Sequence, residues 1–152
     1  IDVGHNQLDW RIRQHPRVVA REGVNARYLQ PDSLPEPVDL IVSDVSFISI
    51  LLILPALPPL LKPGGRMVLL VKPQFEAGPA DVGKGGIVRE GTVRRRVCEE
   101  MWRFFAATEL RPQSLAESPI RGGEGNVEYL LHLRLGGEAK AFPADFGFEG
   151  VS

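Results

Sequence analysis

Residues 39–44, Asp-Leu-Ile-Val-Ser-Asp, and residues 66–72, Arg-Met-Val-Leu-Leu-Val-Lys, decide the fold of this 152-residue chain. Each run is hydrophobic and ends abruptly on a charged residue, Asp44 in the first and Lys72 in the second. Such short apolar runs predict neighbouring strands of a buried parallel sheet. Ligands of an open parallel sheet bind outside the carboxyl ends of its strands. Two opposite charges at that edge therefore indicate an active site.

The segment between these runs, residues 48–61, is almost wholly apolar but is interrupted by Pro55, Pro58 and Pro59. It is shorter than the roughly 20 residues that a membrane-spanning helix needs, so we expect no stable membrane insertion. We predict instead a buried crossover helix, kinked or restarted at Pro55.

The N-terminal part is predicted to hold two strands, at residues 1–4 and 17–21. Between them, Asp9 can cap a short helix that runs to about His15. A helical turn is predicted at residues 25–29. The arginines of this part are interpreted as a solvated face; they are Arg11, Arg13, Arg17, Arg21 and Arg27.

The C-terminal half predicts a long Gly-rich loop at residues 73–90 and an amphipathic helix at residues 92–110. The apolar stripe of that helix consists of Val93, Val97, Met101, Trp102 and Phe105, and the residues placed largely off it are Arg94, Arg95, Glu99 and Arg103. Two strand-like stretches, residues 112–120 and 126–135, follow with a short Gly-rich connection. This connection predicts an antiparallel hairpin, because parallel strands would need a much longer crossover.

These elements predict one α/β domain over residues 1–135, a crossover sheet that ends in an antiparallel hairpin. Residues 136–152 lose the periodicity and are expected to be a disordered tail. The net charge of −1 argues against a dedicated polyanion-binding protein. A single cysteine, Cys98, fits a reducing, cytoplasmic compartment.

A third charged residue, Glu128, stands near the start of the last predicted strand. If that strand is antiparallel, its start lies at the same sheet edge as Asp44 and Lys72, so the three side chains can converge. A lysine held between carboxylates can orient and deprotonate a hydroxyl group. The alternative is a strand-end salt bridge without chemistry. Asp2, at the end of an early strand, is either a ligand for ribose hydroxyls or a simple turn residue.

Five further stretches are distinctive: DVSFIS, LPALPPLLKPGG, VKPQFEAG, VGKGGIVR and SPIRGGEGNVEYLLHL. Together with the opening IDVGHNQLDWRIRQHPRVV and residues 25–29, they resemble the TlyA (hemolysin A) family of FtsJ-like ribosomal RNA 2′-O-methyltransferases. The resemblance covers residues 1 to about 135. It implies a Rossmann-like sheet that uses S-adenosylmethionine to methylate the ribose of cytidine in ribosomal RNA or ribosomal subunits.

The resemblance also implies roles for individual residues. Asp44, Lys72 and Glu128 match the last three members of a catalytic Lys-Asp-Lys-Glu set, in which Lys72 acts on the 2′-hydroxyl. The residues expected to hold the cofactor are Asp2, Val3, Asn25 and Asp44. Lys84 and Arg89 are expected to contact RNA phosphates from a mobile loop, with solvent exposure alone as the alternative.

The family's first catalytic lysine, its glycine-rich cofactor loop on the first strand and its RNA-binding module would all precede Ile1. We therefore expect a partial sheet without its first strand, and a fragment that is a poor or inactive enzyme alone. The rival functions are a noncatalytic RNA-binding remnant and a membrane-active hemolysin.

Two other sequence patterns suggest a nucleotide-binding P-loop and a metal site, and we expect neither. Residues 78–84 fit the first part of a P-loop, but Gly85 stands where Ser or Thr should bind magnesium. The three histidines have no metal-ligand spacing, so no metal is expected.

Overall fold

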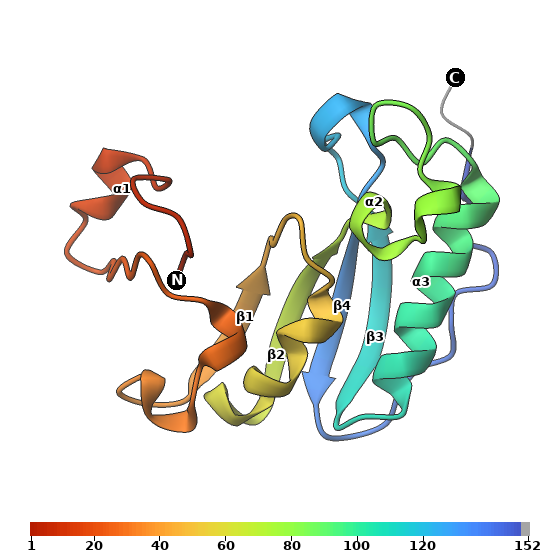
Figure 1. Ribbon diagram of the computed structural model, residues 1–152. Helices are drawn as coiled ribbons and strands as arrows, with labels where there is room; N and C mark the ends of the chain where they lie inside the picture. The colour runs from red at the N-terminus through yellow and green to blue at the C-terminus, as the bar shows by residue number, and fades with distance from the viewer. Residues whose placement is uncertain (150–152) are drawn as a thin grey trace.

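The computed structural model describes residues 1–149 and is built around a four-stranded mixed sheet in the order β1-β2-β4-β3 (Figure 1). The strands are β1 (Val38–Ser43), β2 (Leu61–Val71), β3 (Leu110–Glu117) and β4 (Tyr129–Leu135). β1 and β2 are parallel, whereas β4 is antiparallel to both of its neighbours. The predicted parallel pair and C-terminal antiparallel hairpin are therefore confirmed. The outer edge of β1 pairs with no other described strand.

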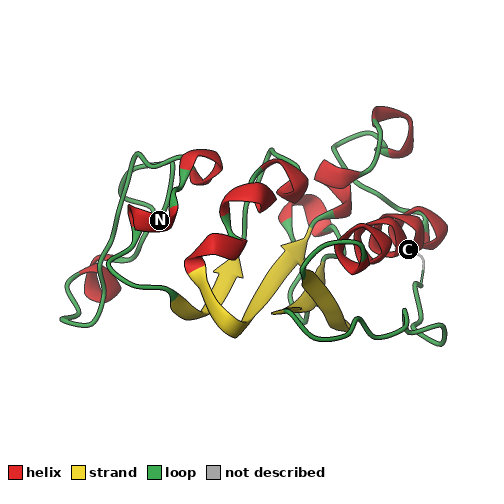
Figure 2. Cartoon of the chain, turned by 90° about the horizontal axis from the view of Figure 1, so that it is seen from below, coloured by secondary structure: helices red, strands yellow, loops and turns green. Residues whose placement is uncertain are grey.

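Buried and more exposed residues alternate along β2, so one face of this strand faces the core. Met67, Leu69 and Val71 are buried, whereas the residues between them are more exposed. Helix α3 (Gly91–Ala106) supplies much of the opposing layer through Val97, Met101, Trp102 and Phe105. Viewed from below, α3 and the helical turns next to the sheet lie on one side of the strands (Figure 2). The helix that we predicted at residues 92–110 is thus confirmed, although β3 already begins at Leu110.

The predicted crossover helix at residues 48–61 is wrong in its form. The segment consists of three 3₁₀ turns, η3 (Ile50–Leu52), η4 (Leu54–Ala56) and η5 (Pro58–Leu60). Because proline donates no backbone hydrogen bond and its ring clashes with the preceding turn, an α-helix cannot continue through this segment. The predicted burial is confirmed, since Ile50, Ile53, Leu54, Leu57 and Leu60 are all buried.

The two strands predicted at residues 1–4 and 17–21 are not present. Three backbone hydrogen bonds join residues 2–4 to residues 21–24: Asp2 N donates to Arg21 O, Gly23 N to Gly4 O and Val24 N to Asp2 O. Only the first of them involves residues 17–21, and a strand needs an extended ladder of such bonds. The helix capped by Asp9 is confirmed as α1 (Trp10–Arg13), and the turn after Asn25 is confirmed as η1 (Ala26–Tyr28).

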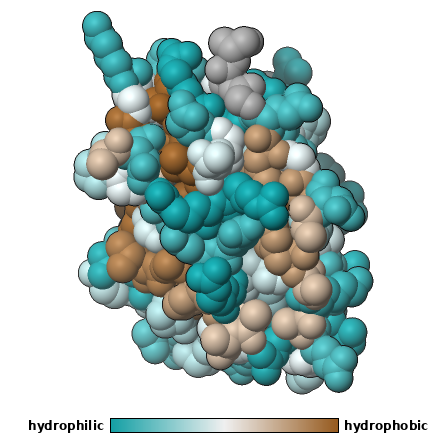
Figure 3. All heavy atoms as spheres, turned by 90° about the vertical axis from the view of Figure 1, so that its right-hand side faces the viewer, coloured by the Kyte–Doolittle hydropathy of each residue, from teal (hydrophilic) through white to brown (hydrophobic). Residues whose placement is uncertain are grey.

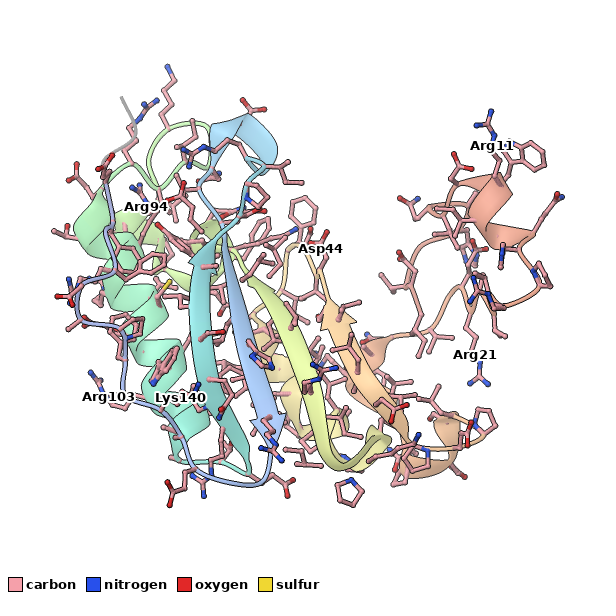
Figure 4. All side chains as sticks on the ribbon, turned by 180° about the vertical axis from the view of Figure 1, so that it is seen from behind. Arg11, Arg21, Asp44, Arg94, Arg103 and Lys140 are labelled. Carbon is pink, nitrogen blue, oxygen red and sulfur yellow. The ribbon has the colours of Figure 1, made fainter. Side chains whose placement is uncertain are left out.

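The N-terminal part lies to one side of the sheet in Figure 1, and Arg11 and Arg21 mark it in Figure 4. All five arginines that we assigned to a solvated face are exposed, so that interpretation is confirmed. No helix among residues 1–149 is long and apolar enough to cross a membrane.

The tail after β4 differs from the disorder that we expected. The backbone carbonyl oxygen of Lys140 accepts a hydrogen bond from Trp102 Nε1 (3.0 Å), and the rings of Trp102 and Phe142 meet edge to face. Phe148 packs on Tyr129 with ring centroids 5.2 Å apart. Apolar and hydrophilic side chains are interspersed on the α3 side of the molecule (Figure 3). The aromatic side chains thus attach the tail to the domain, while residues 150–152 of the predicted tail lie outside the described residues.

Candidate active site

Asp44 and Lys72 meet at the carboxyl edge of the sheet. They directly follow β1 and β2, whose parallel register places both ends at this edge. Lys72 Nζ forms a salt bridge with Asp44 Oδ1 at 2.7 Å and donates a hydrogen bond to Ser46 Oγ, also at 2.7 Å. The lysine side chain is only 12% exposed, whereas that of Asp44 is 70% exposed. Because Lys72 is largely buried and Asp44 is exposed, the ion pair presents Asp44 to the outside of this sheet edge. Figure 4 labels Asp44 there.

Glu128 lies at the same sheet edge but does not join the Lys72–Asp44 ion pair. The antiparallel register pairs Val71 with Tyr129, so the next residues outward, Lys72 and Glu128, lie opposite each other. The Glu128 carboxylate nevertheless accepts a hydrogen bond from Gln74 Nε2 at 2.8 Å. No salt bridge between Glu128 and Lys72 is found in the described part of the chain. The structure therefore brings together two of the three predicted charges and holds the third beside them.

A cavity of about 590 Å³ adjoins Asp44. This volume lies in the range typical of small-molecule sites. Its lining includes all four residues that the resemblance assigns to the cofactor, Asp2, Val3, Asn25 and Asp44. Asp2 Oδ1 accepts from Gly4 N at 2.7 Å, which fits the turn role that we left open for Asp2. Asn25 Oδ1 caps η1 through Arg27 N at 3.0 Å. Both side chains are thus held in fixed orientations at the cavity.

Phe47 is a feature that sequence reasoning missed. It adopts a left-handed backbone conformation (φ 62°), its side chain is 90% exposed, and it lines the same cavity. A positive φ is costly for a bulky residue and is typical of functional sites. The Phe75 ring lies 5.1 Å away, and Lys72 Nζ lies 6.0 Å from the centre of that ring. An exposed aromatic surface therefore stands next to the Lys72–Asp44 pair.

The Gly-rich loop is more constrained than we expected. It contains α2 (Pro73–Glu76), η6 (Pro79–Asp81) and a bridge between Gly83 and Ile87. The buried Asn126 holds it from one side: Asn126 Oδ1 accepts from Val88 N at 3.0 Å, and Asn126 Nδ2 donates to Gly86 O at 2.9 Å.

Arg94 holds the end of this loop from the other side. We predicted Arg94 off the apolar stripe of α3, but it is fully buried. It donates to Val88 O (2.9 Å), to Arg89 O (2.8 Å) and to the Tyr129 hydroxyl (3.1 Å). Burial raises the pKa of Tyr129, and the hydrogen bond from Arg94 offsets part of that rise. Lys84 and Arg89 are themselves exposed on this loop.

The P-loop interpretation is excluded by this geometry, because a turn follows Lys84 and the next helix begins only at Gly91. Burial strongly raises the pKa of the Cys98 thiol, as expected for a packed side chain rather than a nucleophile. Among the described residues, no group of three or more His, Cys, Asp or Glu side chains is placed to bind a metal ion.

Comparison with known proteins assigns the family. The FtsJ-like methyltransferase family model matches residues 1–135. The Bacillus subtilis protein YqxC is 49% identical over 92% of this chain and 50% of its own length. The 16S/23S rRNA (cytidine-2′-O)-methyltransferase TlyA of Mycobacterium tuberculosis is 44% identical over 88% of this chain and 50% of its own length.

A Streptococcus thermophilus protein whose solved structure bears a hemolysin name superposes with a TM-score of 0.84. It is 45% identical, and the match covers 90% of this chain and 50% of that one. The chain thus spans about half the length of the curated relatives it matches. The resemblance to TlyA is confirmed, and the chain belongs to the FtsJ-like methyltransferase family.

Proposed function

We propose that this chain is the catalytic part of an enzyme that methylates ribose 2′-hydroxyls of cytidine in ribosomal RNA, with S-adenosylmethionine as the methyl donor. One observation carries the proposal: Asp44 both lines the 590 Å³ cavity and pairs with Lys72. Methyl donor and reacting hydroxyl would therefore meet at Asp44. We take the proposed substrate, cytidine in ribosomal RNA, from the name of the M. tuberculosis relative.

The side chains that line the cavity are chemically suited to bind S-adenosylmethionine. The Asp2 carboxylate suits the two ribose hydroxyls, Asn25 offers an amide to the adenine, and Val3 contributes apolar surface. When bound, S-adenosylmethionine supplies an electrophilic methyl group. No metal ion is needed for this chemistry.

The remaining chemistry belongs to the side chains at the sheet edge. As an ammonium, Lys72 can only donate a hydrogen bond to the 2′-hydroxyl and orient it. It accepts the hydroxyl proton only after it has lost one of its own, so the form that acts on the nucleophilic oxygen is the neutral amine. Asp44 and Ser46 fix Lys72 through their contacts with Nζ. Glu128 completes the hydrogen-bond network around the reacting ribose.

RNA recognition would use the surfaces on either side of the Lys72–Asp44 pair. Lys84 and Arg89 are exposed cations that suit phosphate groups. Phe47 offers an aromatic face on which an unstacked base can lie. An enzyme of this kind works on ribosomal subunits in the cytoplasm.

The hemolysin names among the relatives raise membrane lysis as a second function. The apolar segment at residues 48–61 argues against it, because Ile50, Ile53 and Leu54 face the protein core rather than the outside. No observation favours this function.

The test is transfer of labelled methyl groups to unmodified ribosomal subunits by the full-length protein. Lys72→Ala should abolish transfer with little change in RNA affinity. Lys62→Ala is the matched control, because Lys62 makes a similar ion pair with Asp39 (3.0 Å) that links β2 to β1 near their other ends. Equal transfer by the two variants would refute the catalytic role of Lys72. Absence of transfer by a folded, cofactor-binding wild type would favour an RNA-binding remnant.

A further inference from the structure

Glu128 is held by two neighbours that belong to different loops. Gln74 Nε2 donates to Glu128 Oε1 at 2.8 Å from one side. On the other side lies the backbone of Gly122: a methyl group there would overlap Oε1 and lie only 2.5 Å from the carboxylate carbon. Glu128 itself is 5% exposed. The carboxylate therefore has little freedom to turn.

The Gln74 amide has only one workable orientation. An ionised carboxylate accepts hydrogen bonds and donates none, so Nε2 must face Glu128 and Oε1 must point away. In the described residues, Gln74 Oε1 is buried and has no hydrogen-bond partner. A buried acceptor without a donor lowers stability. An apolar side chain of the same length would avoid this cost but would leave the Glu128 carboxylate without this donor, so the contact with Glu128 is what Gln74 contributes.

Gly122 requires no special backbone freedom. Its φ of −74° and ψ of −172° are open to alanine. What demands glycine is the proximity of the Glu128 carboxylate. The neighbouring Gly123 has nothing within 4 Å of the position where its methyl group would lie.

The geometry points to Gln74 and Gly122 as positioning residues that fix the Glu128 carboxylate for methyl transfer. This inference rests on the proposed function. Because Lys72 follows Val71 of β2 and Glu128 precedes Tyr129, the residue of β4 that pairs with Val71, the two side chains are adjacent at this edge. A small rotation of Glu128 would therefore change which of its oxygens faces the reacting ribose. Gln74 holds one oxygen by a hydrogen bond, and Gly122 leaves the room that this orientation needs.

The experiment compares Gln74→Met, Gly122→Ala and Gly123→Ala with wild type in the full-length protein. It measures kcat and KM for ribosomal subunits and S-adenosylmethionine, and the melting temperature. Loss of a hydrogen bond to a charged group should lower kcat roughly 10- to 100-fold. Gly122→Ala should act in the same direction by displacing the carboxylate. Gly123→Ala should behave as wild type.

The inference is supported if kcat falls in Gln74→Met and Gly122→Ala while both KM values stay near those of wild type and both variants remain fully folded at the assay temperature. Wild-type kcat in either variant would overturn it. So would a loss of kcat that is matched by a loss of the folded fraction or of cofactor affinity, since that pattern indicates a structural role. In either case an active wild type leaves the proposed function intact, whereas an inactive wild type refutes both.

Discussion

Replacing Arg94 with methionine tests how the domain holds its loop and tail. Methionine retains the length of the side chain but removes a fully buried guanidinium that donates to Val88 O, Arg89 O and the Tyr129 hydroxyl. Arg94 also donates to the carbonyl of Glu149 in the tail. Each hydrogen bond to a charged group contributes about 1.5 kcal/mol at the low end of the usual range.

Water can replace only part of this network. Arg89 is exposed and its carbonyl can be rehydrated, whereas Val88 and Tyr129 are fully buried. The two bonds that water cannot replace give a loss of about 3 kcal/mol in the free energy of unfolding. For a domain of this size, such a loss corresponds to a fall of roughly 6–12 °C in melting temperature.

Urea denaturation and thermal melting would measure the loss. Arg103→Met is the matched control, because Arg103 lies on the same helix but is exposed, and Figure 4 shows it well away from Arg94. The control should change the free energy of unfolding by less than about 0.5 kcal/mol. If Arg94→Met were as stable as Arg103→Met, the buried network would not be stabilising and the reasoning would fail.

Three other substitutions have defined outcomes. Burial raises the pKa of Glu76 above its ordinary 4.5, although hydrogen bonds from Ser49 and Ile50 oppose the rise. The folded protein thus binds this proton more tightly than the unfolded chain, so stability should fall as the pH rises through the folded pKa. Glu76→Gln should remove that fall in urea titrations, and parallel pH curves would contradict it. Asn126→Asp replaces the donor to Gly86 O with an acceptor and should speed amide hydrogen exchange at residues 83–89. Unchanged protection would show that Asn126 does not hold the loop. Phe47→Ala should weaken RNA binding by about 1–3 kcal/mol in a filter-binding assay, with Phe47→Tyr near wild type, and equal affinities would exclude stacking.

The charged sheet edge could be predicted because each strand and the charge at its end lie within one short stretch of sequence. An apolar run that stops at Asp44 or Lys72 specifies both a strand and the charge at its end. The hairpin could be predicted in the same way, from a short Gly-rich connection between two apolar stretches. Placement of Glu128 at that edge then follows from strand direction alone.

The remaining features depend on partners that are distant in the chain. Gln74 and Glu128 are 54 residues apart, and Arg94 and Tyr129 are 35 apart, so no local pattern marks either contact. Helical spacing placed Arg94 largely off the apolar stripe, but the structure buries it because buried acceptors satisfy its guanidinium group. Residues 17–21 have the composition of a strand, yet a strand forms only where a neighbour offers an extended ladder of backbone groups.

The open side of β1 has a practical consequence for handling this chain. Its outer backbone groups face no described strand, and Leu40 and Val42 are 47% and 72% exposed there. A free, apolar strand edge recruits further strands from other molecules, and this one has few of the charges that usually prevent such stacking. At high concentration the isolated 152-residue chain should self-associate through β1. The substitution Val42→Lys should delay the onset of turbidity.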